Sequence, residues 1–159
     1  MMSQLSNFPY DEISIGQTAS YSKLVTDQDI LMFSAVSGDV NPVHLDEEYA
    51  AGTMFSGRIA HGMLTGAVIS AALAMKLPGP GVIYLGQTLR FSRPVKPGDR
   101  ITARLEVTGK RDDKGIVKLA CEVTNQDGDV VASGEAQVMA AREKITLERP
   151  GLPRFKAHG

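Results

Sequence analysis

Two kinds of hydrophobic spacing divide the chain near its middle. Apolar residues recur at helical spacing over Asp27–Ser37 and Gly62–Met75, whereas after residue 81 they alternate with polar residues as in strands. Thr26 is a suitable N-cap for the first helix, and Gly38 follows it where a left-handed residue ends a helix. The second helix is apolar on every face, which is typical of a buried helix.

The alternating segments predict a sheet. A first short strand is expected at 17–25, and four more at 82–91, 101–108, 117–124 and 130–138, separated mostly by turn sequences such as 125–128. Only the helix at 62–75 is available to cover the apolar face of such a sheet. The sequence therefore predicts an α+β fold, with a curved antiparallel sheet wrapped around one long buried helix.

The two ends of the chain lack this periodicity. Residues 1–9 are expected to be loosely held, and 145–159, with Pro150 and Pro153, are expected to form a tail on a single domain spanning 1–159. A one-layer sheet also leaves edge strands, which a second copy of the chain can cover by pairing. We therefore expect a homodimer.

Composition adds limits rather than a function. The net charge of −1 predicts no general attraction to nucleic acid or to an anionic membrane. Cys121 is the single cysteine, so no intrachain disulfide is possible. The sequence shows neither a basic segment followed by an apolar run at its start nor an apolar stretch long enough to span a bilayer. We therefore predict a cytoplasmic protein without a nucleic-acid or membrane partner.

Candidate chemistry begins between the two predicted helices. Asp39 and His44 flank the turn sequence Asn41-Pro42, and a carboxylate and an imidazole brought together there could hold and activate one water. The alternative is structural, with Asp39 capping the turn and His44 as a satisfied core histidine. Spacing alone favours this alternative.

A metal site is a second interpretation of the same region. His44, Asp46 and His61 have the composition of the two-histidine, one-carboxylate triad that binds iron. Against it, His61 follows closely at a helix start, and Asp46 has the position of a helix N-cap. We therefore predict no metal.

The start of the buried helix offers a different kind of group. The backbone N–H of Gly62 points out of the helix end, and the missing side chain would let a substrate carbonyl approach, as in an oxyanion hole. The alternative is that Gly62 is only a packing position. Ser70, two turns further on, could hydrogen-bond a ligand or its own helix backbone.

Taken in order, these motifs are more specific than any one of them. Gly-Asp-x-Asn-Pro-x-His at 38–44, Ile-Ala-His-Gly-Met at 59–63, Ile-Tyr-Leu-Gly-Gln at 83–87 and Arg-Pro-Val-Lys-Pro-Gly-Asp at 93–99 resemble the R-specific enoyl-CoA hydratases of the MaoC-like dehydratase family. The resemblance covers roughly residues 10–140. It implies the hot-dog fold, in agreement with the sheet and helix predicted above.

The resemblance also assigns roles to residues. It implies that Asp39 and His44 activate the water and that Gly62 supplies the oxyanion-hole N–H. It further implies that Ser70 assists in the site and that Asn41 shapes it. The implied reaction is reversible hydration of a trans-2-enoyl-CoA to an (R)-3-hydroxyacyl-CoA, with no cofactor because coenzyme A is part of the substrate. Such products could supply polyhydroxyalkanoate monomers from fatty acid β-oxidation.

Three other activities fit a similar scaffold. A hot-dog acyl-CoA thioesterase would hydrolyse the thioester, although the motif at 38–44 argues against it. A (3R)-hydroxyacyl-ACP dehydratase would differ only in the carrier of the acyl group. A non-catalytic acyl-thioester binding module would not require both Asp39 and His44.

Overall fold

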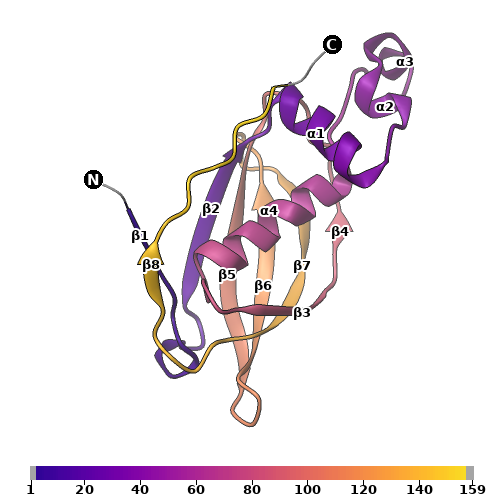
Figure 1. Ribbon diagram of the computed structural model, residues 1–159. Helices are drawn as coiled ribbons and strands as arrows, with labels where there is room; N and C mark the ends of the chain where they lie inside the picture. Colours follow the sequence, from indigo (N-terminus) through magenta and orange to yellow (C-terminus); the bar gives the residue numbers. More distant parts are fainter. Residues whose placement is uncertain (1–2, 157–159) are drawn as a thin grey trace.

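The computed structural model describes residues 3–156 and has the hot-dog fold, an α+β architecture in which a curved antiparallel sheet surrounds a central helix (Figure 1). In chain order the elements are β1 (Gln4–Ser6), η1 (Tyr10–Glu12), β2 (Thr18–Leu24), α1 (Asp27–Ser37), α2 (Pro42–Leu45), α3 (Glu47–Ala51), α4 (Gly62–Met75), β3 (Ile83–Gln87), β4 (Arg90–Phe91), β5 (Arg100–Arg111), β6 (Ile116–Thr124), β7 (Val130–Met139) and β8 (Thr146–Glu148). Among these residues, no helix has both the length and the apolar character needed to cross a bilayer.

The main sheet has six antiparallel strands in the order β2-β5-β6-β7-β3, with the short β4 also paired to β7. The strands β5, β6 and β7 follow one another as a meander at its centre. The strands β2 and β3 lie at its two edges, although both precede the meander in sequence. The four-strand alternation predicted after residue 81 is confirmed for β5, β6 and β7, whose inward side chains are buried.

The core lies between the inner face of this sheet and α4. The helix contributes buried aliphatic side chains that pack on those of β5 and β6: Leu64, Val68, Ile69, Ala72 and Leu73 from α4, and Ile101, Leu105, Leu119 and Val123 from the sheet. Both long helices begin and end where the sequence predicts. Thr26 and Asp29 form a reciprocal capping box at the start of α1, and Gly38 ends that helix with a φ of +81°.

The prediction that α4 is buried is confirmed for the side that faces the sheet, but the chain leaves another side of the helix open. Met63, Ala67 and Ala74 are exposed, and Met63 retains 58% of its accessible surface. Their spacing places them on one side of the helix, which neither the sheet nor another described segment covers. The apolar composition of α4 therefore continues onto a surface that is open in the single chain.

The strand expected at 82–91 is also two strands rather than one. The strand pairing with β7 is interrupted at Thr88 and Leu89. The carbonyl group of Thr88 lies directly against Gly134 of β7. A Cβ at Gly134 would come within 1.8 Å of the Thr88 carbonyl oxygen, so only glycine permits this approach. The break between β3 and β4 thus depends on a residue more than forty positions away.

The prediction of a loosely held N-terminus is corrected for residues 3–9, whereas residues 1–2 and 157–159 lie outside the described part of the chain. The strand β1 pairs with β8, which lies within the segment expected to be a tail. Asn7 is buried, donates from Nδ2 to the Glu143 carbonyl (3.0 Å) and accepts from the Ile145 N–H (2.8 Å). The two end segments therefore form a second small sheet beside β2, and β8 continues into 149–156 (Figure 1).

Candidate active site

Three helices, α1, α2 and α4, bring most of the predicted polar residues together at the N-terminal end of α4. Gly38 ends α1 and turns the chain to Asp39, and α2 then presents His44. Asn41 is the N-cap of α2, accepting from the Val43 N–H at 3.2 Å, and Pro42 occupies the first turn. His61 is the N-cap residue of α4. Nitrogen and oxygen atoms of Asp39, His44 and His61 lie within 4.8 Å of one another.

The Asp39 carboxylate faces the His44 imidazole without touching it. The Asp39 Oδ2 and His44 Nε2 atoms are 3.7 Å apart, which is too far for a direct hydrogen bond but suits two groups that share one water. His44 Nδ1 lies 2.9 Å from the Ile59 carbonyl oxygen, and a carbonyl only accepts, so Nδ1 carries the proton. The lone pair of the neutral ring is thereby on Nε2, the nitrogen facing Asp39.

Asp39 also performs the structural task that the alternative interpretation gave it. Its Oδ1 accepts from the Asn41 N–H at 3.1 Å, which leaves Oδ2 free for His44. The side chain of Asp39 is 49% exposed, whereas that of His44 is 10% exposed. The capping and catalytic interpretations of Asp39 are therefore compatible, since they use different oxygens.

The metal triad of His44, Asp46 and His61 does not assemble. Asp46 Oδ1 accepts from the Tyr49 N–H at 3.0 Å and caps α3 instead. Asp39 takes its place in the cluster, but the His44 and His61 rings are stacked, with centroids 3.8 Å apart and planes 25° apart. Lone pairs in nearly parallel planes do not converge on one ion at about 2.1 Å, the usual metal–nitrogen distance.

Gly62 lies at the edge of a cavity of about 280 Å³ that includes His61, Thr65, Phe91 and Arg93 in its lining. As the first residue of α4, its N–H has no acceptor within the helix and lies at the positive end of the helix dipole. A Cβ here would lie 3.2 Å from two ring atoms of Phe91. Any side chain at this position would be crowded against the Phe91 ring, so glycine keeps the start of the helix open on this side.

Ser70 is not part of this cluster. It lies eight residues after Gly62, about 12 Å along the helix axis, and it does not line the cavity. Its hydroxyl makes no hydrogen bond to any described residue, so the expected alternative of a bond back to the helix backbone is not present. Ser70 is partly exposed beside Ala67 and Ala71, towards the open side of α4.

Sequence reasoning missed two parts of the site. The Ile59 carbonyl, which sets the His44 tautomer, had no sequence signal, because every residue carries a carbonyl. His61 was considered only as a metal ligand, although its position directly before Gly62 in the second motif could have marked it as part of the site.

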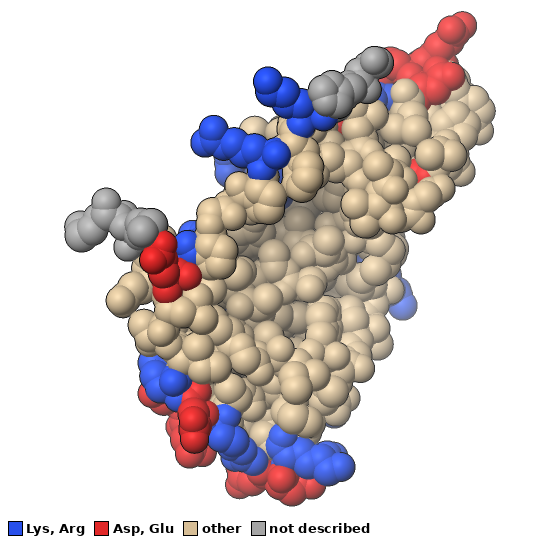
Figure 2. All heavy atoms as spheres, viewed as in Figure 1, with Lys and Arg blue, Asp and Glu red and all other residues tan. Residues whose placement is uncertain are grey.

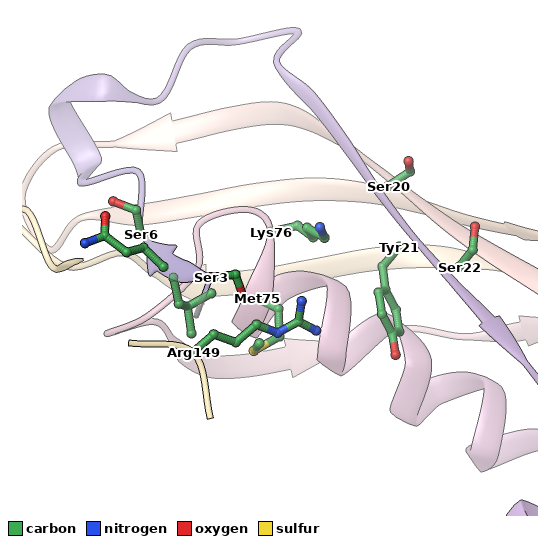
Figure 3. Close-up of a pocket in the computed structure, with 10 residues that line it drawn as sticks. Ser3, Ser6, Ser20, Tyr21, Ser22, Met75, Lys76 and Arg149 are labelled. Carbon is green, nitrogen blue, oxygen red and sulfur yellow. The ribbon is translucent and has the colours of Figure 1, made fainter. Parts of the chain in front are cut away.

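A larger cavity of about 510 Å³ lies at the opposite end of α4 (Figure 3). It is lined by β1 and β2 residues together with Met75, Lys76 and Arg149, and its described lining contains neither a carboxylate nor an imidazole. Of these two cavities, the one at the Gly62 end has an imidazole, that of His61, in its lining.

The fold and the site are those expected of a MaoC-like dehydratase, and comparison with known proteins agrees with this class. The family model described as "MaoC like domain" matches residues 12–128, and the chain belongs to this family. It is 46% identical over 132 residues to the (R)-specific enoyl-CoA hydratase of Rhodospirillum rubrum, covering 82% of this chain and 90% of that protein.

Two solved structures are also similar. The R-hydratase PhaJ1 from Pseudomonas aeruginosa, in the unliganded form, is 54% identical with a TM-score of 0.93, and the match covers 98% of this chain and 100% of that one. The (R)-hydratase from A. caviae involved in PHA biosynthesis is 44% identical with a TM-score of 0.78, covering 80% and 97%.

Proposed function

We propose that the protein is an (R)-specific enoyl-CoA hydratase, a hydro-lyase that reversibly converts trans-2-enoyl-CoA and water into (R)-3-hydroxyacyl-CoA. The observation that carries this proposal is the Asp39–His44 pair, 3.7 Å apart, beside the unbonded N–H of Gly62 at the start of α4. Similar proteins named for this activity support it.

The geometry suggests how the chain performs the reaction. A thioester carbonyl accepting from the Gly62 N–H would polarise the conjugated C2–C3 double bond, because negative charge moving onto its oxygen is stabilised there. Asp39, together with His44, takes a proton from the attacking water molecule as the oxygen of that water bonds to C3. The proton taken from the water passes through His44 Nε2 to the C2 carbanion, so that a hydroxyl group is added at C3 and a hydrogen at C2.

The remaining site assignments are part of the same proposal. Asn41 acts by holding α2, and therefore His44, through its cap on the Val43 N–H. The unbonded hydroxyl of Ser70 faces the open side of α4, where an acyl chain extending from Gly62 would pass. The chemistry calls for no cofactor or metal, since coenzyme A arrives as part of the substrate.

A homodimer is the assembly that the open surfaces favour. The strand β3 is an edge strand whose Ile83 (55%), Tyr84 (39%) and Leu85 (47%) remain exposed. Charged side chains lie around the margins of the face shown in Figure 2, leaving the central region over α4 and β3 largely uncharged. An apolar edge beside the open side of α4 is suited to pairing with a second copy.

The decisive assay is hydration of trans-2-enoyl-CoA substrates of increasing chain length, with product chirality and free CoA measured together. We expect (R)-3-hydroxyacyl-CoA and no CoA release. Release of CoA would indicate a thioesterase, turnover of acyl-ACP alone would indicate a dehydratase of fatty acid synthesis, and binding without turnover would indicate a binding module.

The product of the proposed reaction also suggests a physiological setting. The product is the kind of thioester from which polyhydroxyalkanoates are made, and the similar A. caviae protein is described as involved in that synthesis. We propose that this chain supplies such monomers from fatty acid β-oxidation. A cytoplasmic location is part of this proposal and is supported by the single free cysteine, which is buried.

A further inference from the structure

His61 is a buried imidazole to which the proposed reaction assigns no task. The residue is 3% exposed and lies between two rings, with the Phe33 centroid at 4.9 Å and the His44 centroid at 3.8 Å. Although it is the N-cap residue of α4, its side chain makes no capping hydrogen bond. Helix capping therefore does not account for a histidine at this position.

The proton on the His61 ring can be placed from its contacts. Nε2 lies 3.1 Å from the main-chain carbonyl oxygen of Asp39 and 3.1 Å from Ser34 Oγ. The carbonyl only accepts, so Nε2 carries the proton and Nδ1 does not. Nδ1 is fully buried and has no hydrogen-bond partner among the described residues.

This arrangement is a poor choice if packing is the purpose. A buried acceptor without a partner is destabilising, and a phenylalanine would fill the same space between Phe33 and His44 without that penalty. What histidine adds to phenylalanine here is the Nε2–H bond to the Asp39 backbone. The contacts therefore associate His61 with the turn that carries the proposed base.

The same ring also restricts His44. The hydrogen bond from His44 Nδ1 to the Ile59 carbonyl fixes one atom of that imidazole, about which the ring could still turn. The stacked face of His61 blocks such a turn, since the planes are 25° apart at a centroid distance of 3.8 Å. One side chain thus contacts both halves of the pair, the backbone of Asp39 and the ring of His44.

We infer that His61 is a positioning residue that sets the separation of Asp39 and His44, through its Nε2–H bond to one and its stacked face on the other. It acts on the reaction only through these two residues and does not touch the water. The inference rests on the proposed hydratase function. This role also explains why His61 directly precedes Gly62, because the start of α4 then positions both the oxyanion-hole N–H and the Asp39–His44 pair.

Two substitutions separate the two contacts. His61→Phe keeps a stacked ring and removes the donor, whereas His61→Gln keeps a donor and removes the ring. A small displacement of a reacting group can lower the reaction rate about 100-fold. We therefore expect kcat for crotonyl-CoA to fall about 100-fold in His61→Phe and about 10-fold in His61→Gln. KM should stay within about threefold of wild type, because both variants keep Gly62 and the other residues that line the cavity.

The control is Val107→Ala, which removes buried volume from β5 at a distance from the start of α4. It should lower Tm while leaving kcat and the pH profile of kcat unchanged in the folded fraction, whereas the His61 variants change that profile. A folded His61→Phe enzyme with kcat within about threefold of wild type would overturn the inference, as would a loss confined to KM.

A measurement on the wild-type protein covers the case in which both variants fail to fold. Imidazole ¹⁵N chemical shifts report the tautomer of each histidine, and we expect Nε2–H for His61 and Nδ1–H for His44 at neutral pH. The opposite tautomer at His61 would remove the bond to Asp39 and refute the inference. Because this experiment needs no turnover, it can succeed even where the hydration assay fails, so the two proposals fail separately.

Discussion

Asp39 uses its two carboxylate oxygens for different tasks, and a single substitution separates them. Asparagine at this position retains an oxygen acceptor for the Asn41 N–H but is not a base. We expect Asp39→Asn to lower hydration of crotonyl-CoA by about 10²–10⁴ or more. The free energy of unfolding should change by less than about 0.5 kcal/mol, because the side chain is half exposed. Normal turnover by the folded variant would exclude Asp39 as the base.

Tyr10 provides a residue-scale prediction for stability rather than activity. Burial, followed by its hydrogen bond to Asp112 Oδ1 (2.6 Å), raises the pKa of Tyr10 to about 12. The folded state therefore retains a proton that the unfolded chain releases near pH 10, so this stabilisation is complete below pH 10 and is lost as the pH rises towards 12. Urea unfolding between pH 8 and 11.5 should show a shallower alkaline decline for Tyr10→Phe.

Some decline will remain in Tyr10→Phe, because the partial burial of Tyr84 raises its pKa to about 12 and burial raises the pKa of Cys121. Parallel curves for the wild type and Tyr10→Phe would mean that Tyr10 is not a source of the effect.

At the residue scale the sequence was informative where a residue acts through its own side chain, as Asp39 does. It was silent where the partner is a backbone atom, as at Ile59.

At the scale of elements, local sequence patterns predicted the bounds of α1 and α4 correctly. They did not predict the contact between Thr88 and Gly134 that divides β3 from β4. Thr26, Gly38 and the apolar run after Gly62 are sufficient for α1 and α4, because caps and periodicity are local. The division between β3 and β4 was not predictable, because alternation continues through 82–91 and the cause lies at Gly134. The exposed side of α4 was missed for a similar reason, since an apolar pattern does not say what covers each face.

Gly134→Ala tests the origin of that division. The added methyl group would overlap the Thr88 carbonyl, so strands β4 and β7 would have to separate, and we expect a loss of about 1–3 kcal/mol or more in urea unfolding. Gly109→Ala in β5 is the matched control, because its Cβ would meet only the Lys118 side chain at ordinary distances of 3.6–3.9 Å. Equal stability of the two variants would contradict the steric explanation.

At the scale of the whole molecule, the open edge at β3 and the open side of α4 predict that the protein is a homodimer. Light scattering should give twice the chain mass of 17.0 kDa for the wild type. Leu85→Glu places a charge on the exposed part of β3 and should shift the equilibrium to monomer. Ile15→Glu is the control, because Ile15 is also exposed (62%, against 47% for Leu85) but precedes β2 at the opposite edge of the sheet. Dissociation by both variants, or by neither, would argue against pairing through β3.

The strand order has a consequence for synthesis of the chain on the ribosome. The edge strands β2 and β3 are made first, but their partners β5 and β7 are made later, and β7 ends only at Met139. Translation proceeds at about 5–20 residues per second, so α4 waits on the order of several seconds for the sheet that buries it. During that interval the nascent chain presents its most apolar segment unprotected, and the hairpins of β5, β6 and β7 must form before the earlier half can dock. Newly made chains should therefore depend on holdase chaperones more than the finished fold would suggest.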